Sequence, residues 1–225
     1  MESTSRRRAR KIADYHLAGG DPLGWFDEVY ATAGEDMAAI PWADAQPNPK
    51  LLQWLDGGGE AGEGRRALVV GCGLGDDAEE LSRHGFDVTA FDISPISIAW
   101  CRKRFPDSTV EYHAADLFQA PAQWANRFDF VFEAYTLQSL PGDLRPLAMG
   151  DIAQFLAPGG TVLVVARGRD PHEPDTGPPW PLTRSELATF NAHGLVELSF
   201  VDDMDGDDPS TRRFMGLYRK SDKAF

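Results

Sequence analysis

Short apolar runs alternate with amphipathic segments along most of the chain. Residues 67–70 and 88–91 are apolar, and the acidic amphipathic segment between them ends near Gly85. Strand-length apolar runs on either side of a helical period predict a strand–helix–strand unit. The same alternation predicts helices at 94–105 and 144–156, and strands at 109–113, 128–134 and 161–166. Strands that alternate with helices favour an α/β fold with a doubly wound, mostly parallel sheet.

The C-terminal part departs from this order. A helix is predicted at 183–193 and strands at 195–200 and 213–219, with an acidic turn around 202–208. Gly206 within that turn is typical of a hairpin connection, so we expect the last two strands to be antiparallel. The acidic turn lacks the spacing and the closing glutamate of an EF-hand, and no metal site is predicted.

Two segments lie outside the alternation. Within residues 1–64, the Asp21-Pro22 pair indicates the first residues of a helix that carries Trp25 and Tyr30. The basic residues before this helix are interpreted as a solvated tail rather than a transit or nuclear signal. Residues 167–181 contain five prolines, and so long a loop in a compact domain is uncommon unless it is functional or disordered. We predict an N-terminal helical lid and connector over 1–64 and a core over 65–225.

Composition and net charge limit the classes of molecule that the protein is expected to bind. The 225 residues are 42% hydrophobic and 25% charged, which is typical of a globular protein, and the net charge is -13. A field of that sign repels phosphate groups, so neither a nucleic acid nor a membrane is expected as a partner. The two cysteines lack metal-site spacing and no apolar run has the length of a membrane span. We therefore expect a soluble, cytoplasmic monomer.

A glycine-rich turn gives the sharpest chemical signal. Gly71, Gly73 and Gly75 follow the first strand, where glycines allow a tight turn and the close approach of a ligand to the backbone. A dinucleotide fingerprint needs a glycine where this chain has Asp76, and Asp77 follows. Two carboxylates at this helix start would repel a pyrophosphate, so a ligand without phosphate and with a positive end is favoured over NAD.

Further acidic residues fall at the carboxyl ends of the next strands, the edge where open α/β sheets bind ligands. Asp92 ends the second strand and can accept hydrogen bonds from both hydroxyls of a ribose, and Ile93 can pack on an adenine. Asp116 follows the third strand, where its carboxylate can accept a hydrogen bond from the exocyclic amine of an adenine. Glu133 ends the fourth strand and would face a cationic ligand.

With these motifs, residues 66–167 resemble the class I S-adenosylmethionine-dependent methyltransferases. The resemblance rests on the glycine-rich turn, Asp92, Asp116, the fourth-strand motif FDFVFEAYTLQSLP and LAPGGTVLVV before the fifth strand. It implies a seven-stranded Rossmann-like sheet and S-adenosyl-L-methionine as the cofactor. It also implies residue roles: the three glycines shape the methionine end, Asp92 holds the ribose, Asp116 and Leu117 border the adenine, and Glu133 lies near the cofactor amino group or the acceptor.

The segments 42–49 and 177–187 are similar to the small-molecule branch of that family, which contains thiopurine, thiol and halide methyltransferases. That branch usually carries an Asp-Arg pair where this chain has Glu133-Ala134, so sulfur, nitrogen and oxygen all remain open as the acceptor atom. The implied function is methyl transfer to a small-molecule acceptor, with 1–64 and 167–181 closing over it.

Methyl transfer from a sulfonium is an in-line displacement, which needs alignment and a dry environment rather than a covalent nucleophile. Aromatic faces can stabilise the sulfonium, and the candidates are Trp42 beside the cofactor and Trp25, Tyr30 and Trp180 beside the acceptor, with ordinary packing as the alternative for each. If the acceptor must lose a proton, the candidate bases are Glu133, Tyr135, Asp170 and His172. Two other classes stay open: a methyltransferase-like binding module without turnover and a nucleotide-cofactor oxidoreductase.

Overall fold

Seven strands form one sheet in the computed structural model, which describes residues 3–59, 61–204 and 211–222. The order across the sheet is β3-β2-β1-β4-β5-β7-β6. The strands are β1 (Arg66–Val70), β2 (Asp87–Asp92), β3 (Glu111–Ala114), β4 (Phe128–Ala134), β5 (Leu156–Arg167), β6 (Leu195–Met204) and β7 (Arg212–Lys220). The first five are parallel, and β7 lies antiparallel between β5 and β6. The predicted fold class is confirmed, including the antiparallel final pair.

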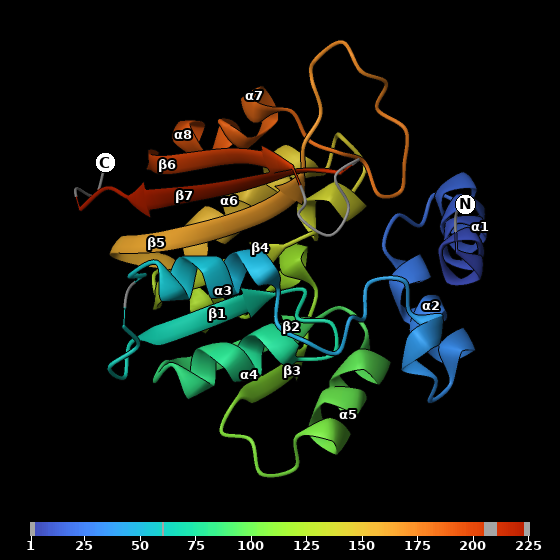
Figure 1. Cartoon of the computed structure of the whole chain (residues 1–225), viewed down its shortest axis with the longest axis horizontal. Helices are drawn as coiled ribbons and strands as arrows, with labels where there is room; N and C mark the ends of the chain where they lie inside the picture. The colour runs from blue at the N-terminus through green and yellow to red at the C-terminus, as the bar shows by residue number, and fades with distance from the viewer. Residues whose placement is uncertain (1–2, 60, 205–210, 223–225) are drawn as a thin grey trace.

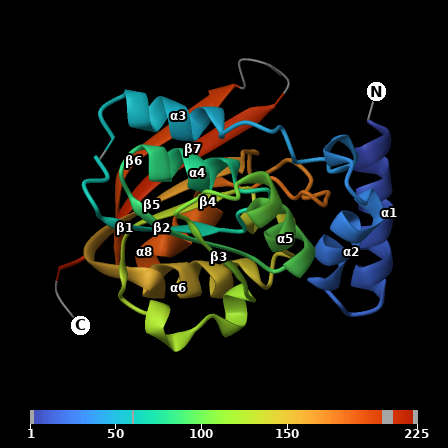
Figure 2. The same ribbon diagram turned by 90° about the horizontal axis from the view of Figure 1, so that it is seen from below.

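Helices cover both faces of the sheet, because the side chains of each central strand alternate between two apolar clusters. Figures 1 and 2 show α3 (Pro49–Asp56), α4 (Asp76–Arg83) and α5 (Pro95–Arg104) on one face and α6 (Arg145–Phe155) on the other. The short helices α7 (Arg184–Leu187) and α8 (Thr189–Ala192) pack with α6, through Leu187 and Phe190. The single helix expected over 183–193 is therefore two short ones.

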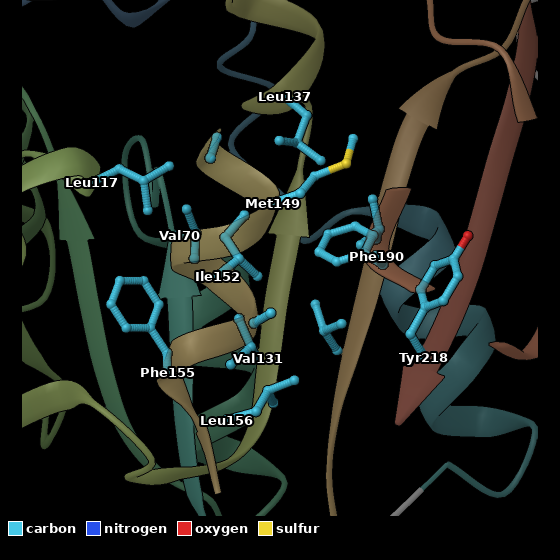
Figure 3. Packing of buried hydrophobic residues seen from close by; sticks show 14 of the residues in the cluster. Val70, Leu117, Val131, Leu137, Met149, Ile152, Phe155, Leu156, Phe190 and Tyr218 are labelled. Carbon is cyan, nitrogen blue, oxygen red and sulfur yellow. The ribbon is translucent and has the colours of Figure 1, made fainter. Parts of the chain in front are cut away.

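The α6 face shows how the core is filled (Figure 3). Met149, Ile152 and Phe155 project from α6 into a cluster that includes Val70 of β1 and Val131 of β4. Each of these side chains is at least 95% buried. Burial of one such side chain contributes roughly 1.5–3 kcal/mol, so this face fixes α6 and the strands beneath it as one rigid unit.

The N-terminal residues form two helices at the end of the sheet to which β1 and β5 point (Figures 1 and 2). Helix α1 spans Thr4–Ala18 and α2 spans Gly24–Ala33. The expected tail is thus a helix from residue 4 onward, because the Ser3 hydroxyl caps it and the small side chains of Ala9 and Ala13 pack against α2. Its basic side chains are exposed, as expected. Four 3-10 turns complete the described elements: η1 (Met37–Ala39), η2 (Leu117–Gln119), η3 (Ala122–Trp124) and η4 (Leu137–Ser139).

Helix α3 was not predicted by the sequence pattern. Asn48 caps it and Pro49 occupies its first position, and its Trp54 stacks on Phe130 of β4 at 4.7 Å between ring centroids. Part of the segment assigned to the lid is therefore packed on the core. The acidic turn expected around 202–208 lies largely outside the described residues. Within the described ranges, every helix is too short or too polar to span a bilayer.

A histidine clamps α1 to α2. His16 Nδ1 lies 2.9 Å from Asp21 Oδ2, and His16 Nε2 lies 2.6 Å from Glu28 Oε2. A histidine with a carboxylate at each ring nitrogen is favoured as the doubly protonated cation. The hydrogen bonds with Glu28 and Asp21 therefore raise the pKa of His16 above 6.5.

We predict that this clamp weakens at alkaline pH. Because the folded pKa of His16 exceeds its unfolded value, its stabilisation is complete below about pH 6.5 and is lost as pH rises through the folded pKa. Hydrogen-exchange protection factors of the α1 amides should fall between pH 6 and pH 9 in the native protein. The His16→Gln variant should be less protected at pH 6 and show no such fall, whereas His113→Gln should behave like the native protein. Unchanged protection in His16→Gln at pH 6 would contradict the clamp.

Candidate functional site

A cavity of about 1160 Å³ opens at the carboxyl ends of β1, β2 and β4. Its walls come from the turns after these strands and from α1, α2 and the segment 41–50. Pro178 and Pro179 add a wall from the proline-rich loop. The cavity therefore lies where the topology of an open α/β sheet places ligand sites, and it is covered by the N-terminal helices.

The floor of the cavity is the glycine-rich turn after β1. Gly71, Gly73 and Gly75 have φ angles of +61°, +54° and +90°, a backbone region that residues other than glycine rarely adopt. A Cβ on Gly71 would lie 2.2 Å from Thr136 Oγ1, and one on Gly75 would lie 2.6 Å from the Tyr112 hydroxyl oxygen. A Cβ on Gly73 would meet only the Tyr30 hydroxyl, at 3.6 Å. Gly71 and Gly75 thus allow the chain to pack, while Gly73 leaves backbone open to a ligand.

Asp92 is the carboxylate that organises this floor. Its Oδ2 accepts a hydrogen bond from the backbone N–H of Gly73 at 3.0 Å, and its Oδ1 accepts one from Ser94 at 2.9 Å. The side chain lines the cavity and is 7% exposed. Burial raises the pKa of Asp92 to about 6, against the lowering effect of these two hydrogen bonds.

The two carboxylates at the start of α4 are both engaged. Asp76 makes a bidentate ion pair with Arg104, at 2.7 and 2.8 Å. Asp77 accepts a hydrogen bond from the backbone N–H of Asn48 at 2.6 Å, which ties the start of α3 to the glycine-rich turn. Burial raises the pKa of Asp77 to about 7. Acidic side chains therefore occupy the helix end on which a dinucleotide pyrophosphate would rest.

Aromatic side chains of the N-terminal region form a second wall. Trp25, Tyr30 and Trp42 all line the cavity, and Trp25 and Tyr30 are also buried in the apolar cluster of the N-terminal helices, so their ligand contacts remain predictions. The indole N–H of Trp42 donates to the Tyr30 hydroxyl at 2.8 Å, and the two rings meet edge to face at 5.8 Å. Trp25 meets Trp42 in the same way at 5.9 Å. These contacts give the wall a fixed shape.

Residues after β2 and β3 complete the side near Asp92. Ile93, Asp116 and Leu117 line the cavity, as expected. Asp116 Oδ1 accepts a hydrogen bond from the N–H of Phe118 at 2.9 Å, and its Oδ2 accepts one from the side-chain amide of Gln119 at 2.9 Å. Asp116 thus caps η2 while it faces the cavity, and its predicted contact with an adenine remains a prediction.

Glu133 lies beneath the cavity rather than in its wall. Its Oε1 accepts hydrogen bonds from the backbone N–H groups of Thr136 and Leu137, at 2.6 and 3.0 Å, so it shapes the turn after β4. The side chain is fully buried, its Oε2 has no hydrogen-bond partner, and burial raises its pKa to about 7. The next turn residue, Tyr135, has a φ of +67° and lines the cavity.

Two other predicted site residues belong to the proline-rich loop. His172 is exposed and does not line the cavity. Trp180 also lies outside the lining, but its backbone N–H donates to the carbonyl oxygen of Gln138 at 2.6 Å and its ring lies 5.9 Å from the guanidinium of Arg145. Arg145 is buried and bound to Glu186 Oε1 at 2.7 Å, so it anchors the loop. The ligand roles of His172 and Trp180 stay predictions, as do those of Gly75 and Glu133.

Sequence reasoning missed the basic residues of the cavity. Arg6 and Arg10 of α1 and Lys50 of α3 line it. Arg167 at the end of β5 and Arg213 near the start of β7 line it as well. Their only signal in the sequence is position, because a strand that runs antiparallel to β5 brings its first residues beside the last residues of β5. Among the described residues, no group of three or more potential metal ligands gathers.

Comparisons with known proteins agree with this geometry. A family described as "Methyltransferase domain" matches residues 67–160. The chain is 26% identical over 167 residues to 2-heptyl-1-hydroxyquinolin-4(1H)-one methyltransferase of Mycobacteroides abscessus, covering 72% of each chain. It is 27% identical over 202 residues to probable thiol methyltransferase 2 of Arabidopsis thaliana, covering 88% of this chain and 83% of the relative.

The fold is also that of a solved methyltransferase. N-methyltransferase NodS from Bradyrhizobium japonicum, crystallised with S-adenosylhomocysteine, matches with a TM-score of 0.65 and 20% identity, over 86% of this chain and 96% of NodS. The matched domain contains the glycine-rich turn, Asp92 and the turn after β4, which are the parts that build the cavity floor. Residues 67–160 therefore match a methyltransferase domain, and together with the fold this match supports a class I S-adenosylmethionine-dependent methyltransferase.

Proposed function

We propose that the protein transfers a methyl group from S-adenosyl-L-methionine to a small-molecule acceptor with a sulfur, nitrogen or oxygen nucleophile. The observation that carries this proposal is that one cavity joins the floor formed by Asp92 and the glycine-rich turn to a wall of aromatic residues and prolines. Its volume of about 1160 Å³ lies above the usual range for a pocket that holds one small ligand, which leaves room for an acceptor beside the cofactor.

The residues at the floor fit the cofactor. The exposed backbone at Gly73 suits the amino-acid end, where no side chain blocks approach. Asp92 is placed to accept the ribose hydroxyls, with Ile93 and Leu117 as apolar neighbours for the adenine. Asp76 and Asp77 disfavour a pyrophosphate but not a ligand without phosphate. When bound, S-adenosylmethionine supplies an electrophilic methyl group on a sulfonium.

The remaining walls suit the acceptor. Trp25, Tyr30 and Trp42 line the cavity with aromatic rings, which can stabilise a cation and exclude water, and the loss of water strengthens electrostatic interactions inside the cavity. Tyr135 is the candidate base that lines the cavity, and we assign it the position next to the acceptor. Glu133 acts through its two backbone hydrogen bonds, which hold Tyr135 in place. The names of the relatives, a thiol and a hydroxyquinolinone methyltransferase, support a small acceptor.

The direct test is the release of S-adenosylhomocysteine with panels of thiols, phenols and amines. Turnover with at least one small acceptor is expected. If the purified protein binds S-adenosylmethionine but methylates no compound of the panels, the result supports the alternative of a binding module without turnover. If it binds NADH instead, the oxidoreductase alternative replaces both.

We predict that Asp92→Asn weakens S-adenosylmethionine binding by about tenfold or more, because an amide cannot accept hydrogen bonds at both of its terminal atoms. The measurement is calorimetric titration, with Asp87→Asn as the matched control at the other end of β2. The control should bind like the native protein. Native affinity in Asp92→Asn would refute the ribose assignment.

We also predict a pH dependence that originates at Asp92. The folded pKa of about 6 exceeds the unfolded value of 3.8, so ionisation of Asp92 destabilises the ligand-free protein as pH rises between these values. Binding to the ribose needs the ionised form, and affinity for S-adenosylmethionine should therefore fall as pH drops below about 6. The titration at pH 5 and pH 7.5 checks this. In Asp92→Asn, the part of the pH dependence of S-adenosylmethionine affinity that comes from Asp92 should be absent. An identical pH profile of affinity in the variant and the native protein would contradict this prediction.

A further inference from the structure

Two arginines meet at one end of the cavity. Arg167 and Arg213 are register partners in the antiparallel β5–β7 pair, and both line the cavity. Side chains directly opposite each other on neighbouring strands share a face and lie close together, and two like charges in that arrangement repel. The sheet therefore places concentrated positive charge at this end of the cavity.

Contacts around Arg213 orient its charge toward the same space. Its guanidinium carbon lies 5.4 Å from the ring centroid of Tyr135, which also lines the cavity. The neighbouring Arg212 instead binds Asp202 and Asp170, at 2.5 and 2.8 Å. Asp203, opposite Arg213 in the sheet, binds Lys50 at 3.0 Å. Arg213 thus lines the cavity beside Tyr135, whereas Arg212 does not line it and is bound to these two carboxylates.

Along the edge of the sheet, the charged residues that line the cavity are divided between its two sides, and Arg6, Arg10 and Lys50 line it from the N-terminal region. The carboxylates that line it after β1, β2 and β3 are Asp76, Asp77, Asp92 and Asp116, and Asp44 lines it from the segment 41–50. The arginine pair belongs to β5 and β7, on the other side of β4 in the sheet. A protein with a net charge of -13 therefore carries a local basic region where the acceptor would bind.

We propose that the acceptor is a small organic anion whose carboxylate is bound by Arg167 and Arg213. Guanidinium groups match a carboxylate with paired, charge-assisted hydrogen bonds. Tyr135 and Pro178 are placed to pack against the apolar body of the acceptor. This inference rests on the proposed function and names the substrate class of the same site.

The test uses three pairs of probes that differ only in charge: para-mercapto-, para-hydroxy- and para-aminobenzoate, each with its benzamide. Binding is measured by calorimetry on protein saturated with S-adenosylhomocysteine. At least one benzoate should bind about tenfold or more tightly than its amide. Arg167→Gln and Arg213→Gln should each remove most of that preference, and Arg213→Lys should retain part of it. The control Arg219→Gln changes an arginine of the same strand that binds the Gly159 carbonyl oxygen, and it should keep the full preference.

Two results would overturn the proposal: no benzoate binds better than its amide, or the preference survives in both glutamine variants. S-adenosylhomocysteine affinity is measured in every variant, together with the thermal unfolding midpoint. If the native protein does not bind S-adenosylhomocysteine, that result counts against the proposed function. Native cofactor binding without discrimination between acid and amide counts only against the acceptor class.

Discussion

The buried carboxylate of Asp92 is the interaction on which the site depends. It joins the glycine-rich turn after β1 to the start of α5, through the backbone N–H groups of Gly73 and Ser94. Ser94 in turn donates its hydroxyl to Asp27 of α2, at 2.5 Å, so the same junction reaches the N-terminal helices. Burying a carboxylate is costly unless its oxygens are bonded, and these contacts offset part of that cost.

The junction explains why floor and cover form one cavity. The carbonyl oxygen of Gly73 also accepts hydrogen bonds from the Ser97 hydroxyl and the Cys101 thiol of α5. The turn is therefore held from both sides while its open face stays toward the cavity. Above it, the hydrogen bond between Trp42 and Tyr30 fixes the aromatic wall. Positioning of this kind is what a displacement reaction requires of its enzyme, since the reacting groups must be aligned and kept dry.

The sequence was sufficient for those parts of the fold that follow from local periodicity. Alternating apolar runs gave the seven strands, and the carboxyl-edge rule placed Asp92 and Asp116 at the cavity. Helix α1 was missed because its start is rich in arginine and the two residues it buries, Ala9 and Ala13, are small, with Ile12 and Leu17 only partly buried beside them. The position of Glu133 beneath the cavity was not predictable, because strand position does not reveal which backbone groups a carboxylate will bind.

The positions of Arg167 and Arg213 in the cavity were also not predictable from the sequence. Arg167 and Arg213 are far apart in the sequence, and only the insertion of β7 between β5 and β6 makes them neighbours. No local pattern reports such a pairing. Residues brought together by an antiparallel strand in a mostly parallel sheet therefore need the three-dimensional structure to be found.

A crystal structure of the protein with S-adenosylhomocysteine tests the central claim most directly. The ribose hydroxyls should lie within hydrogen-bond distance of Asp92, with the amino-acid end over Gly73 and the Tyr135 side of the cavity left for the acceptor. A ribose bound away from Asp92, with the glycine-rich turn not in contact with the ligand, would contradict it.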